Sequence, residues 1–257
     1  MNATVSNFYS MISRQELKHI RSLHQKKRRD ETGLFLVEGE KSLAEVLRSL
    51  WEVELVLATT DFLTKYPAFK ISGKRRILEV DPQILQQAGS LETNDTGLAV
   101  VRKVIPGKFS EPRNRFTLVA EDISDPGNLG SLMRIADWYG IGEILLSENS
   151  VEVYNPKVIQ ASMGSFLRVT VHYGRLAEIF SQKKIPLIGT FPEGDNLYDF
   201  RFPAEGYLLL GNESKGISDE LMKYLDARLA IPRFGNAESL NVAVAAAVIL
   251  DNLKRKP

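Results

Sequence analysis

The feature that most constrains the fold is a series of short apolar strands in the second half of the chain, each followed by a helical pattern. Residues 116–120, 143–146 and 208–211 are continuous in their apolar character rather than alternating. Strands of this kind are buried on both faces, which is typical of a parallel sheet covered by helices. We therefore expect an α/β fold here, with ligands bound beyond the carboxyl ends of the strands.

The first half of the chain predicts a separate and smaller α/β unit. Short strands are expected at residues 34–37, 53–57, 76–80 and 96–104. The composition then changes, because residues 105–115 hold two prolines, a glycine and several charges without periodicity. We expect one domain at 1–106, a linker at 107–115 and a second domain at 116–257.

Basic residues are concentrated near the amino terminus. The first 30 residues hold seven Lys and Arg against two Asp and Glu, although the net charge of the whole chain is only +1. One helix is expected over residues 13–30, begun by a capping box of Ser13 and Glu16. The basic cluster at its end is Lys26, Lys27, Arg28 and Arg29. Such a cluster indicates either cations placed favourably at a helix C-terminus or contact with phosphates.

Several classes of protein are excluded by composition. The chain has no cysteine, which excludes disulfides and cysteine-based metal sites, and its three histidines lack ligand spacing, so we expect no metal. No signal peptide and no apolar run of transmembrane length is found. The expected location is therefore cytoplasmic, with no membrane partner.

Two loops follow predicted strands and carry polar residues. In DPGNLGSLMR, residues 125–134, Asn128 is a candidate N-cap, and Arg134 can reach back toward the strand ends. In YLLLGNESKGIS, residues 207–218, two glycines allow the backbone to approach a ligand closely. Glu213 follows a buried strand, where a carboxylate is costly unless paired, and Arg134 is a candidate partner. Each motif taken alone is typical of an ordinary loop.

A third loop precedes the last helix, in IPRFGNAESLNVAVAAAVIL at residues 231–250. Ser239 is a candidate N-cap, and apolar residues from Leu240 onward recur at helical spacing. The other faces of this helix are nearly as apolar, so we expect it to be buried. Ser239 and Asn241 place polar groups where the loop enters the helix.

Together the three loops resemble the signature motifs of the SpoU (TrmH) family of RNA ribose methyltransferases. The matching residues are Asn128, Gly130 and Arg134 in the first motif, Leu210, Gly211, Glu213 and Gly216 in the second, and Ile231, Pro232, Glu238, Ser239, Leu240 and Asn241 in the third. The resemblance covers roughly residues 115–253. More loosely, the amino-terminal half is similar to a small substrate-binding domain often attached to this family.

The resemblance implies a SPOUT fold with a carboxy-terminal trefoil knot, a homodimer formed through that domain, and S-adenosylmethionine as the cofactor. The residues implied to bind the cofactor are Gly211, Ile231 and Leu240, with Gly189, Thr190 and Asn212 nearby. Arg134 is implied to activate the ribose hydroxyl. Asn128, Ser239 and Asn241 would orient Arg134 and the ribose, and Glu213 would hold Arg134 in place. RNA phosphates would contact Lys26, Lys27, Arg28 and Arg29.

The implied activity is methyl transfer to a ribose 2′-OH. Ribosomal RNA is the favoured substrate, because an additional domain precedes the knot core. The alternatives are transfer RNA, a non-catalytic RNA-binding or assembly protein that retains the fold, and methylation of a base nitrogen. A free guanidinium keeps its proton at neutral pH, so Arg134 is favoured as an electrostatic stabiliser, while a role as general base stays open. Two features depart from the family pattern, Asn212 and the pair Arg233-Phe234, and either could alter substrate access.

Overall fold

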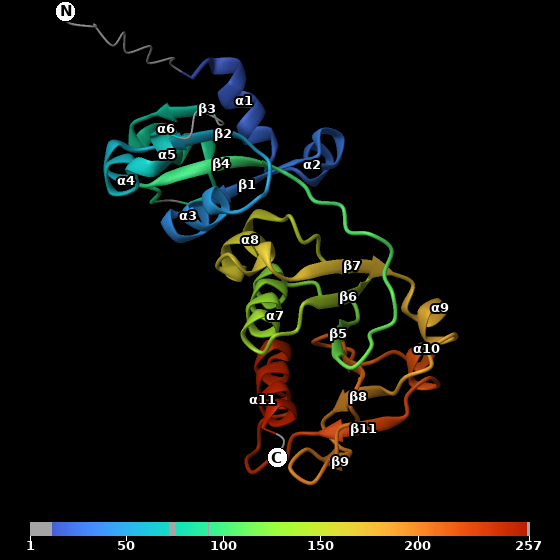
Figure 1. Ribbon diagram of the computed structural model, residues 1–257. Helices are drawn as coiled ribbons and strands as arrows, with labels where there is room; N and C mark the ends of the chain where they lie inside the picture. The colour runs from blue at the N-terminus through green and yellow to red at the C-terminus, as the bar shows by residue number, and fades with distance from the viewer. Residues whose placement is uncertain (1–11, 72–75, 92, 256–257) are drawn as a thin grey trace, which may run out of the picture. The chain divides into compact units, whose positions relative to one another are not determined.

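The computed structural model describes residues 12–71, 76–91 and 93–255, which form two compact units (Figure 1). The first unit runs to Val104 and includes Tyr154–Pro156. The second comprises Ile105–Val153 and the chain from Lys157 onward. Each unit has its own sheet.

The first unit is a four-stranded mixed sheet with helices. Its strands are β1 (Leu34–Glu38), β2 (Val53–Ala58), β3 (Arg76–Glu79) and β4 (Gly97–Arg102). Their order is β1-β4-β2-β3, with β2 and β3 parallel and the other two pairs antiparallel. The helices are α1 (Arg14–Ser22), α2 (Lys26–Thr32), α3 (Glu40–Arg48), α4 (Thr60–Lys65), α5 (Pro67–Ile71) and α6 (Pro82–Ala88). A core cluster that includes Ile20, Leu36, Leu57 and Leu85 joins α1 and α6 to the sheet.

The prediction of a single helix over residues 13–30 is wrong. The capping box of Ser13 and Glu16 is confirmed, but α1 ends at Ser22 and α2 begins at Lys26. Arg29 explains the break, because its Nη1 donates to the carbonyl oxygens of Leu23 and His24, both at 2.9 Å. Carbonyls at a helix C-terminus lack partners within the helix, and this buried guanidinium supplies one.

The second unit is a seven-stranded sheet in which every pair of strands is parallel, as the continuous apolar strands predicted. The strands are β5 (Phe116–Ala120), β6 (Glu143–Ser147), β7 (Thr170–Gly174), β8 (Leu187–Phe191), β9 (Asp195–Asn196), β10 (Gly206–Leu210) and β11 (Ala227–Ala230). Their order is β7-β6-β5-β10-β8-β11-β9. A strand expected at 167–171 lies three residues later, because residues 165–167 form a 3₁₀ turn.

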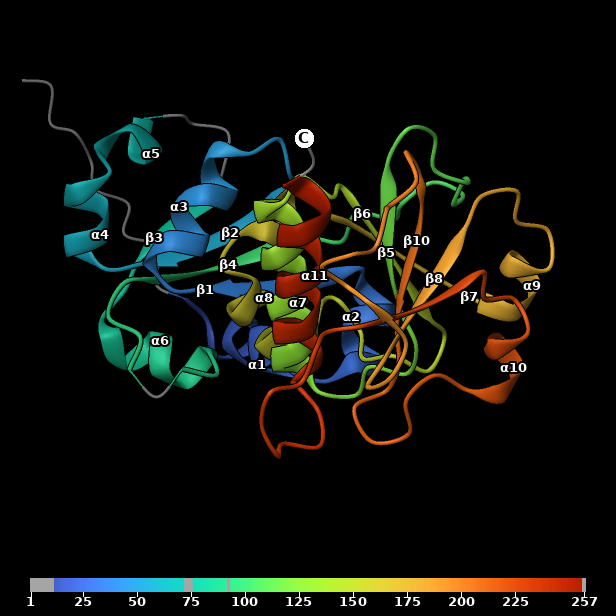
Figure 2. The same ribbon diagram turned by 90° about the horizontal axis from the view of Figure 1, so that it is seen from below.

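The helices of the second unit are α7 (Pro126–Trp138), α8 (Pro156–Ser162), α9 (Leu176–Phe180), α10 (Asp219–Met222) and α11 (Val242–Lys254). Helices α7 and α11 pack against each other, as Figure 1 and Figure 2 both show. The sequence predicted that helix α11 is buried on all sides. This prediction is wrong, because Val244 is 50% exposed. One face of this apolar helix therefore meets solvent.

Residues 105–115 carry no helix or strand and pack along the second unit. The Phe109 ring lies 5.3 Å from that of His172 and 6.3 Å from that of Tyr207, measured between centroids. Glu111 accepts a hydrogen bond from the backbone of Lys184 at 2.7 Å. The segment is thus anchored at several points. Within the described residues, no helix is long and apolar enough to cross a membrane.

Candidate active site

Three loops meet at one edge of the parallel sheet. They follow β5, β10 and β11, which are the strands expected to carry the three motifs. Because the strands are parallel, their carboxyl ends lie on the same side of the sheet, and β5 and β10 are direct neighbours. Polar side chains distant in the sequence are therefore brought together there.

A chain of hydrogen bonds joins the three loops. Asn241 Nδ2 donates to Asn128 Oδ1 at 2.8 Å, and Asn128 Nδ2 donates to Glu213 Oε1 at 2.8 Å. Each residue comes from a different motif, so one connected set of side chains links the start of α7, the loop after β10 and the start of α11. We call Asn241, Asn128 and Glu213 the amide–carboxylate chain.

The direction of this chain follows from helix capping. Asn241 is the N-cap of α11, and its Oδ1 accepts from the backbone of Ala243 at 2.9 Å and of Val244 at 3.4 Å. Its amide nitrogen must then face Asn128, which presents its own oxygen. The nitrogen of Asn128 is left to donate, and the carboxylate of Glu213 accepts it. A helix cap therefore sets the polarity of the whole site.

The two caps expected from the sequence were placed on the wrong residues. Asp125, not Asn128, caps α7, because its Oδ1 accepts from the backbone of Asn128 at 2.8 Å. Asn241, not Ser239, caps α11, and Ser239 is exposed at the cavity described below. In both loops several residues of the capping type occur close together, so spacing alone did not choose between them.

Arg134 lies outside this chain of contacts. It is exposed on α7, and within the described residues it has no ion pair or hydrogen bond, so the expected pairing with Glu213 is wrong. Helical geometry gives the reason, because six residues rotate the side chain by about 240° from the direction of Asn128. Arg134 therefore remains available for a ligand that approaches this face of α7.

The loop after β10 is stabilised by hydrogen bonds within its backbone and by the side chain of Asn212. Asn212 and Gly216 form an isolated bridge, and Asn212 Nδ2 donates to the carbonyl of Asp122 at 2.7 Å. Its Oδ1 accepts from the backbone of Ser214 and Lys215. Both the oxygen and the nitrogen of the Asn212 side chain are thus engaged in hydrogen bonds to the backbone. A Cβ at Gly211 would lie 2.4 Å from the carbonyl carbon of Gly216, so this tight closure requires glycine.

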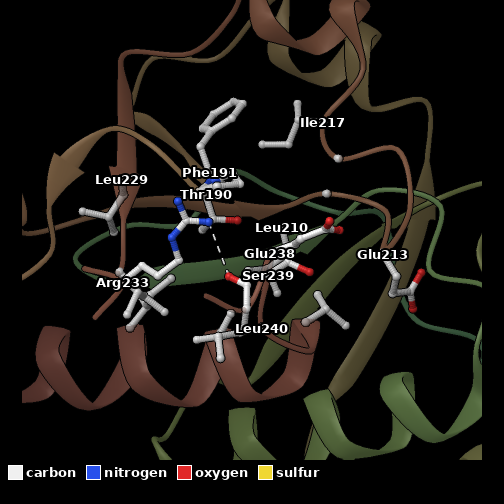
Figure 3. A pocket seen from close by; sticks show the side chains of 18 of the residues that line it. Thr190, Phe191, Leu210, Glu213, Ile217, Leu229, Arg233, Glu238, Ser239 and Leu240 are labelled. Atoms are coloured by element: carbon white, nitrogen blue, oxygen red, sulfur yellow. Dashed lines mark hydrogen bonds between the residues drawn. The ribbon is translucent and has the colours of Figure 1, made fainter. Parts of the chain in front are cut away.

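A cavity of about 840 Å³ lies beside these loops (Figure 3). Of the residues implied by the resemblance, it is lined by Thr190, Gly211, Asn212, Glu213, Ile231, Ser239 and Leu240. Gly189 does not line it, because this glycine is a packing position where a Cβ would lie 2.8 Å from Leu225. Asn128, Arg134 and Asn241 are also outside the lining. In Figure 3 Glu213 lies to one side of the group formed by Thr190 and Leu240.

Some lining residues were not assigned to the site from the sequence. They include Phe191, Lys215, Ile217, Arg233, Phe234 and Ile249. The pair Arg233-Phe234 was noted only as a departure from the family pattern, while Ile249 belongs to an apolar helical face that resembles any core helix. Gly130, which belongs to the first motif, is a packing position, because a Cβ there would lie 2.5 Å from Ala161 of α8.

The basic cluster of the first unit is divided by the structure. Lys26 and Lys27 are exposed at the start of α2, without an ion pair in the described residues. Arg28 is paired with Glu31 at 2.7 Å. Arg29 is 2% exposed and is hydrogen bonded to carbonyls, so its expected role in phosphate contact is corrected to a structural one.

The parallel sheet and the cavity at its carboxyl edge define an α/β protein that binds a small ligand beyond its strands. Comparison with known families specifies it further. The model of the SpoU rRNA Methylase family matches residues 115–251, more than half of the chain, and the chain belongs to this family. The model of the MRM3-like substrate binding domain matches residues 14–99.

Similar proteins cover nearly the whole chain. The 23S rRNA (guanosine(2553)-2′-O)-methyltransferase RlmP of Bacillus subtilis is 29% identical, over 93% of this chain and 96% of its own. A 23S rRNA (uridine(2479)-2′-O)-methyltransferase of Streptomyces viridochromogenes is also 29% identical, over 89% and 85%. A solved structure of the TrmH family from Porphyromonas gingivalis has a TM-score of 0.82 at 32% identity, covering 95% of this chain and 98% of its own.

A further solved structure shows the same fold at lower identity. It is the SpoU methyltransferase AviRb from Streptomyces viridochromogenes in complex with AdoMet. Its TM-score is 0.80 at 24% identity, with 95% of this chain and 98% of that one covered. Both units of the chain therefore have counterparts in known structures.

Proposed function

We propose that this protein transfers a methyl group from S-adenosylmethionine to a ribose 2′-OH, and that its substrate is ribosomal RNA. The observation that carries the proposal is the amide–carboxylate chain, which links the three family motifs and reaches a cavity of about 840 Å³ through Glu213. The named relatives that cover most of the chain act on 23S rRNA, which supports the choice of RNA.

The cavity fits the cofactor in size and chemistry. Its volume lies in the range of small-molecule sites, and side chains of Leu210, Ile231 and Leu240 provide apolar walls for an adenine ring. The backbone N–H and C=O of Leu240 have no hydrogen-bond partner within the described residues, so both can bind polar edges of a ligand. When bound, the cofactor supplies a methyl group on a sulfonium as the electrophile.

The residues of the chain supply orientation and charge. The 2′-oxygen must lose its proton as it forms the new bond to the methyl carbon, and negative charge develops on it. The guanidinium of Arg134, which has no partner in the described residues and lies outside the cavity lining of its own chain, is proposed to stabilise that charge and to hold an adjoining phosphate by two parallel hydrogen bonds. Asn128, Ser239 and Asn241 orient the ribose, and Glu213 holds Asn128 rather than Arg134.

The first unit, residues 1–106 of the expected division, is proposed to bind RNA, with 107–115 connecting it to the catalytic domain at 116–257. Its match to a substrate binding domain supports this role. Arg14, Lys18 and Arg21 recur at helical spacing on exposed positions of α1, and Lys26 and Lys27 follow them. The acids of this segment are already engaged, Glu16 with Arg76 and Asp30 with Lys103, which leaves these cations for phosphates.

We also infer a trefoil knot in the second unit. Strand β10 returns to the middle of the sheet between β5 and β8, and β11 then lies beyond β8. After β11 the chain crosses back, and α11 packs on α7. A return of this kind across earlier segments supports threading of the carboxy-terminal chain, which is rare in proteins.

A homodimer through the second unit is proposed from the surface of α7 and α11. Val244 is 50% exposed on α11, with Ala247 and Val248 half-buried on the same side of the helix. On α7, Trp138 is 83% exposed and lies one turn after Arg134. Exposed apolar residues on two packed helices favour contact with a second copy.

The test is methyl transfer from labelled S-adenosylmethionine to total RNA from a strain that lacks the gene, followed by digestion to nucleosides. We expect a 2′-O-methylnucleoside in ribosomal RNA with the wild-type chain. Arg134→Ala should lower kcat by roughly 100- to 1,000-fold, the loss typical of one stabiliser of developing charge. Arg201→Ala, which removes another exposed arginine without a partner in the described residues, is the matched control.

Other outcomes would contradict parts of the proposal. A base-methylated product would replace ribose methylation, and label in transfer RNA alone would change the substrate. Cofactor binding without transfer, to naked RNA and to ribosomal particles alike, would favour the non-catalytic RNA-binding protein.

A further inference from the structure

An aromatic ring at the mouth of the cavity packs on no other ring in the described part of the chain. Phe234 lines the cavity and is nevertheless 90% exposed. It lies two residues after Pro232 and directly before Gly235, where a Cβ would meet no atom within 4 Å. The ring is therefore open to solvent at the entrance of the cavity. A ring this exposed buries little apolar area, and its place on the cavity lining makes it available to a ligand that enters there.

Two cations line the same cavity as this ring. Lys215 lies on the loop after β10, where its backbone N–H donates to Asn212 Oδ1 at 3.0 Å, while its ammonium group has no partner in the described residues. Arg233 is adjacent to Phe234, and its guanidinium makes one long hydrogen bond of 3.4 Å to the carbonyl of Ala237 (Figure 3). Both side chains are free enough to reach a phosphate.

The rim also holds two carboxylates, which equal the two cations in number. Glu213 is bound to Asn128, whereas Glu238 is exposed and has no partner in the described residues. An open aromatic face next to an arginine in the chain, at the entrance of a cavity, is suited to bind single-stranded nucleic acid by stacking and phosphate contact.

We propose that Phe234 stacks on a base of the substrate RNA at the mouth of the cavity, with Lys215 and Arg233 on the adjoining phosphates. This inference rests on the proposed function and adds a positioning element to it. RNA recognition favours unpaired bases that stack on aromatic side chains, so the substrate nucleotide would lie in a loop or be turned out of a helix. The pair Arg233-Phe234, which departs from the family pattern, would thus help select the RNA.

The experiment compares three substitutions of one ring in the full-length chain. Phe234→Ala removes the ring, Phe234→Leu keeps apolar bulk without an aromatic face, and Phe234→Trp restores a larger face. The first two should lower kcat/KM for ribosomal RNA by roughly 5- to 150-fold, mainly through KM, as expected for one stacked base. Phe234→Trp should recover most of the loss. Tyr198→Ala, which removes a ring 58% exposed and outside the cavity lining, should have no effect.

Binding of S-adenosylmethionine and molecular mass are measured on the same variants. We expect the cofactor Kd and the mass to be unchanged. A Kd raised in step with KM would mean that Phe234 covers the cofactor, and a halved mass would mean that it joins two copies. Either result would overturn the stacking proposal, as would equal KM values for Phe234→Ala, Phe234→Leu and the wild type.

A binding titration separates this inference from the proposed function. A single-stranded RNA oligonucleotide of mixed sequence should quench the fluorescence of Phe234→Trp beyond any quenching in the wild type, whose tryptophans are Trp51 and Trp138. If the wild type transfers no methyl group, the proposed function fails while quenching still decides the stacking. Absence of the added quenching would overturn the stacking proposal.

Discussion

At the scale of single residues, the site depends on a helix cap that also acts as a link. Asn241 accepts from the first turn of α11 with its oxygen and donates to Asn128 with its nitrogen. A side chain with two acceptor oxygens could accept from the first turn of α11 but could not donate to Asn128. This division allows stability and activity to be separated by one substitution.

Asn241→Asp should keep the fold and lose activity. Aspartate caps helices as well as asparagine does and is favoured by the helix dipole, so Tm should change by only about 2 °C. The second carboxylate oxygen would face Asn128 Oδ1, which forces Asn128 to turn away from Glu213. We expect a loss of kcat of roughly 10-fold or more, measured beside Tm. Asn241→Ala is the comparison and should lower both, with the cap worth about 1 kcal/mol. An active, stable Asn241→Asp would contradict the directed chain.

Gly211 and Gly235 lie on two loops of the cavity and differ in the space around them, so they serve as a test position and its control. A Cβ at Gly211 would lie 2.4 Å from the backbone of Gly216, whereas a Cβ at Gly235 would meet no atom within 4 Å. Gly211→Ala should therefore lower the free energy of unfolding by about 1–3 kcal/mol and weaken cofactor binding. Gly235→Ala should change neither. Urea denaturation and cofactor titration test both, and equal stabilities would refute the steric argument.

At the scale of elements, the break between α1 and α2 separates two kinds of basic residue. Arg29 is buried and satisfies carbonyls, while Lys26 and Lys27 are exposed. The sequence presents all of them as one cluster. Their roles differ because the chain turns after Ser22 and carries the Arg29 side chain inward.

Lys26→Glu with Lys27→Glu should weaken RNA binding in a way that depends on salt. Each lost phosphate contact reduces the slope of log K against log salt by about 0.7 to 1. We expect the double variant to lower the slope by roughly 1.5 to 2 and to leave cofactor binding unchanged. Lys41→Glu, at another exposed lysine of the same unit, is the control. An unchanged slope in the double variant would move the RNA surface elsewhere.

At the scale of the whole molecule, the second unit exposes an apolar face where two helices pack. Val244→Arg on this face should convert a dimer to a monomer in sedimentation equilibrium. The mass should fall from about twice 28.8 kDa to 28.8 kDa. Leu50→Arg is the control, because Leu50 is fully exposed in the first unit. A wild-type chain that sediments as a monomer would exclude the proposed dimer.

The proposed knot predicts an unusual response to force. When a knotted chain is pulled from its ends, the tightened knot retains a stretch of residues. The contour length after unfolding should therefore stay below that of a fully extended chain, roughly 3.6 Å for each residue. Extension to the full length in single-molecule force spectroscopy would show that the second unit is not knotted.

The sequence by itself determined the parallel sheet, the three loops at strand ends and the family, because continuous apolar strands and local motifs are properties of neighbouring residues. Only the tertiary structure decided which candidate caps each helix, that Glu213 binds Asn128 instead of Arg134, and that Gly130 and Gly189 are packing positions. It also buried Arg29 and left Phe234 open. These outcomes depend on contacts between segments as much as 113 residues apart, such as the bond from Asn241 to Asn128, which local spacing does not encode.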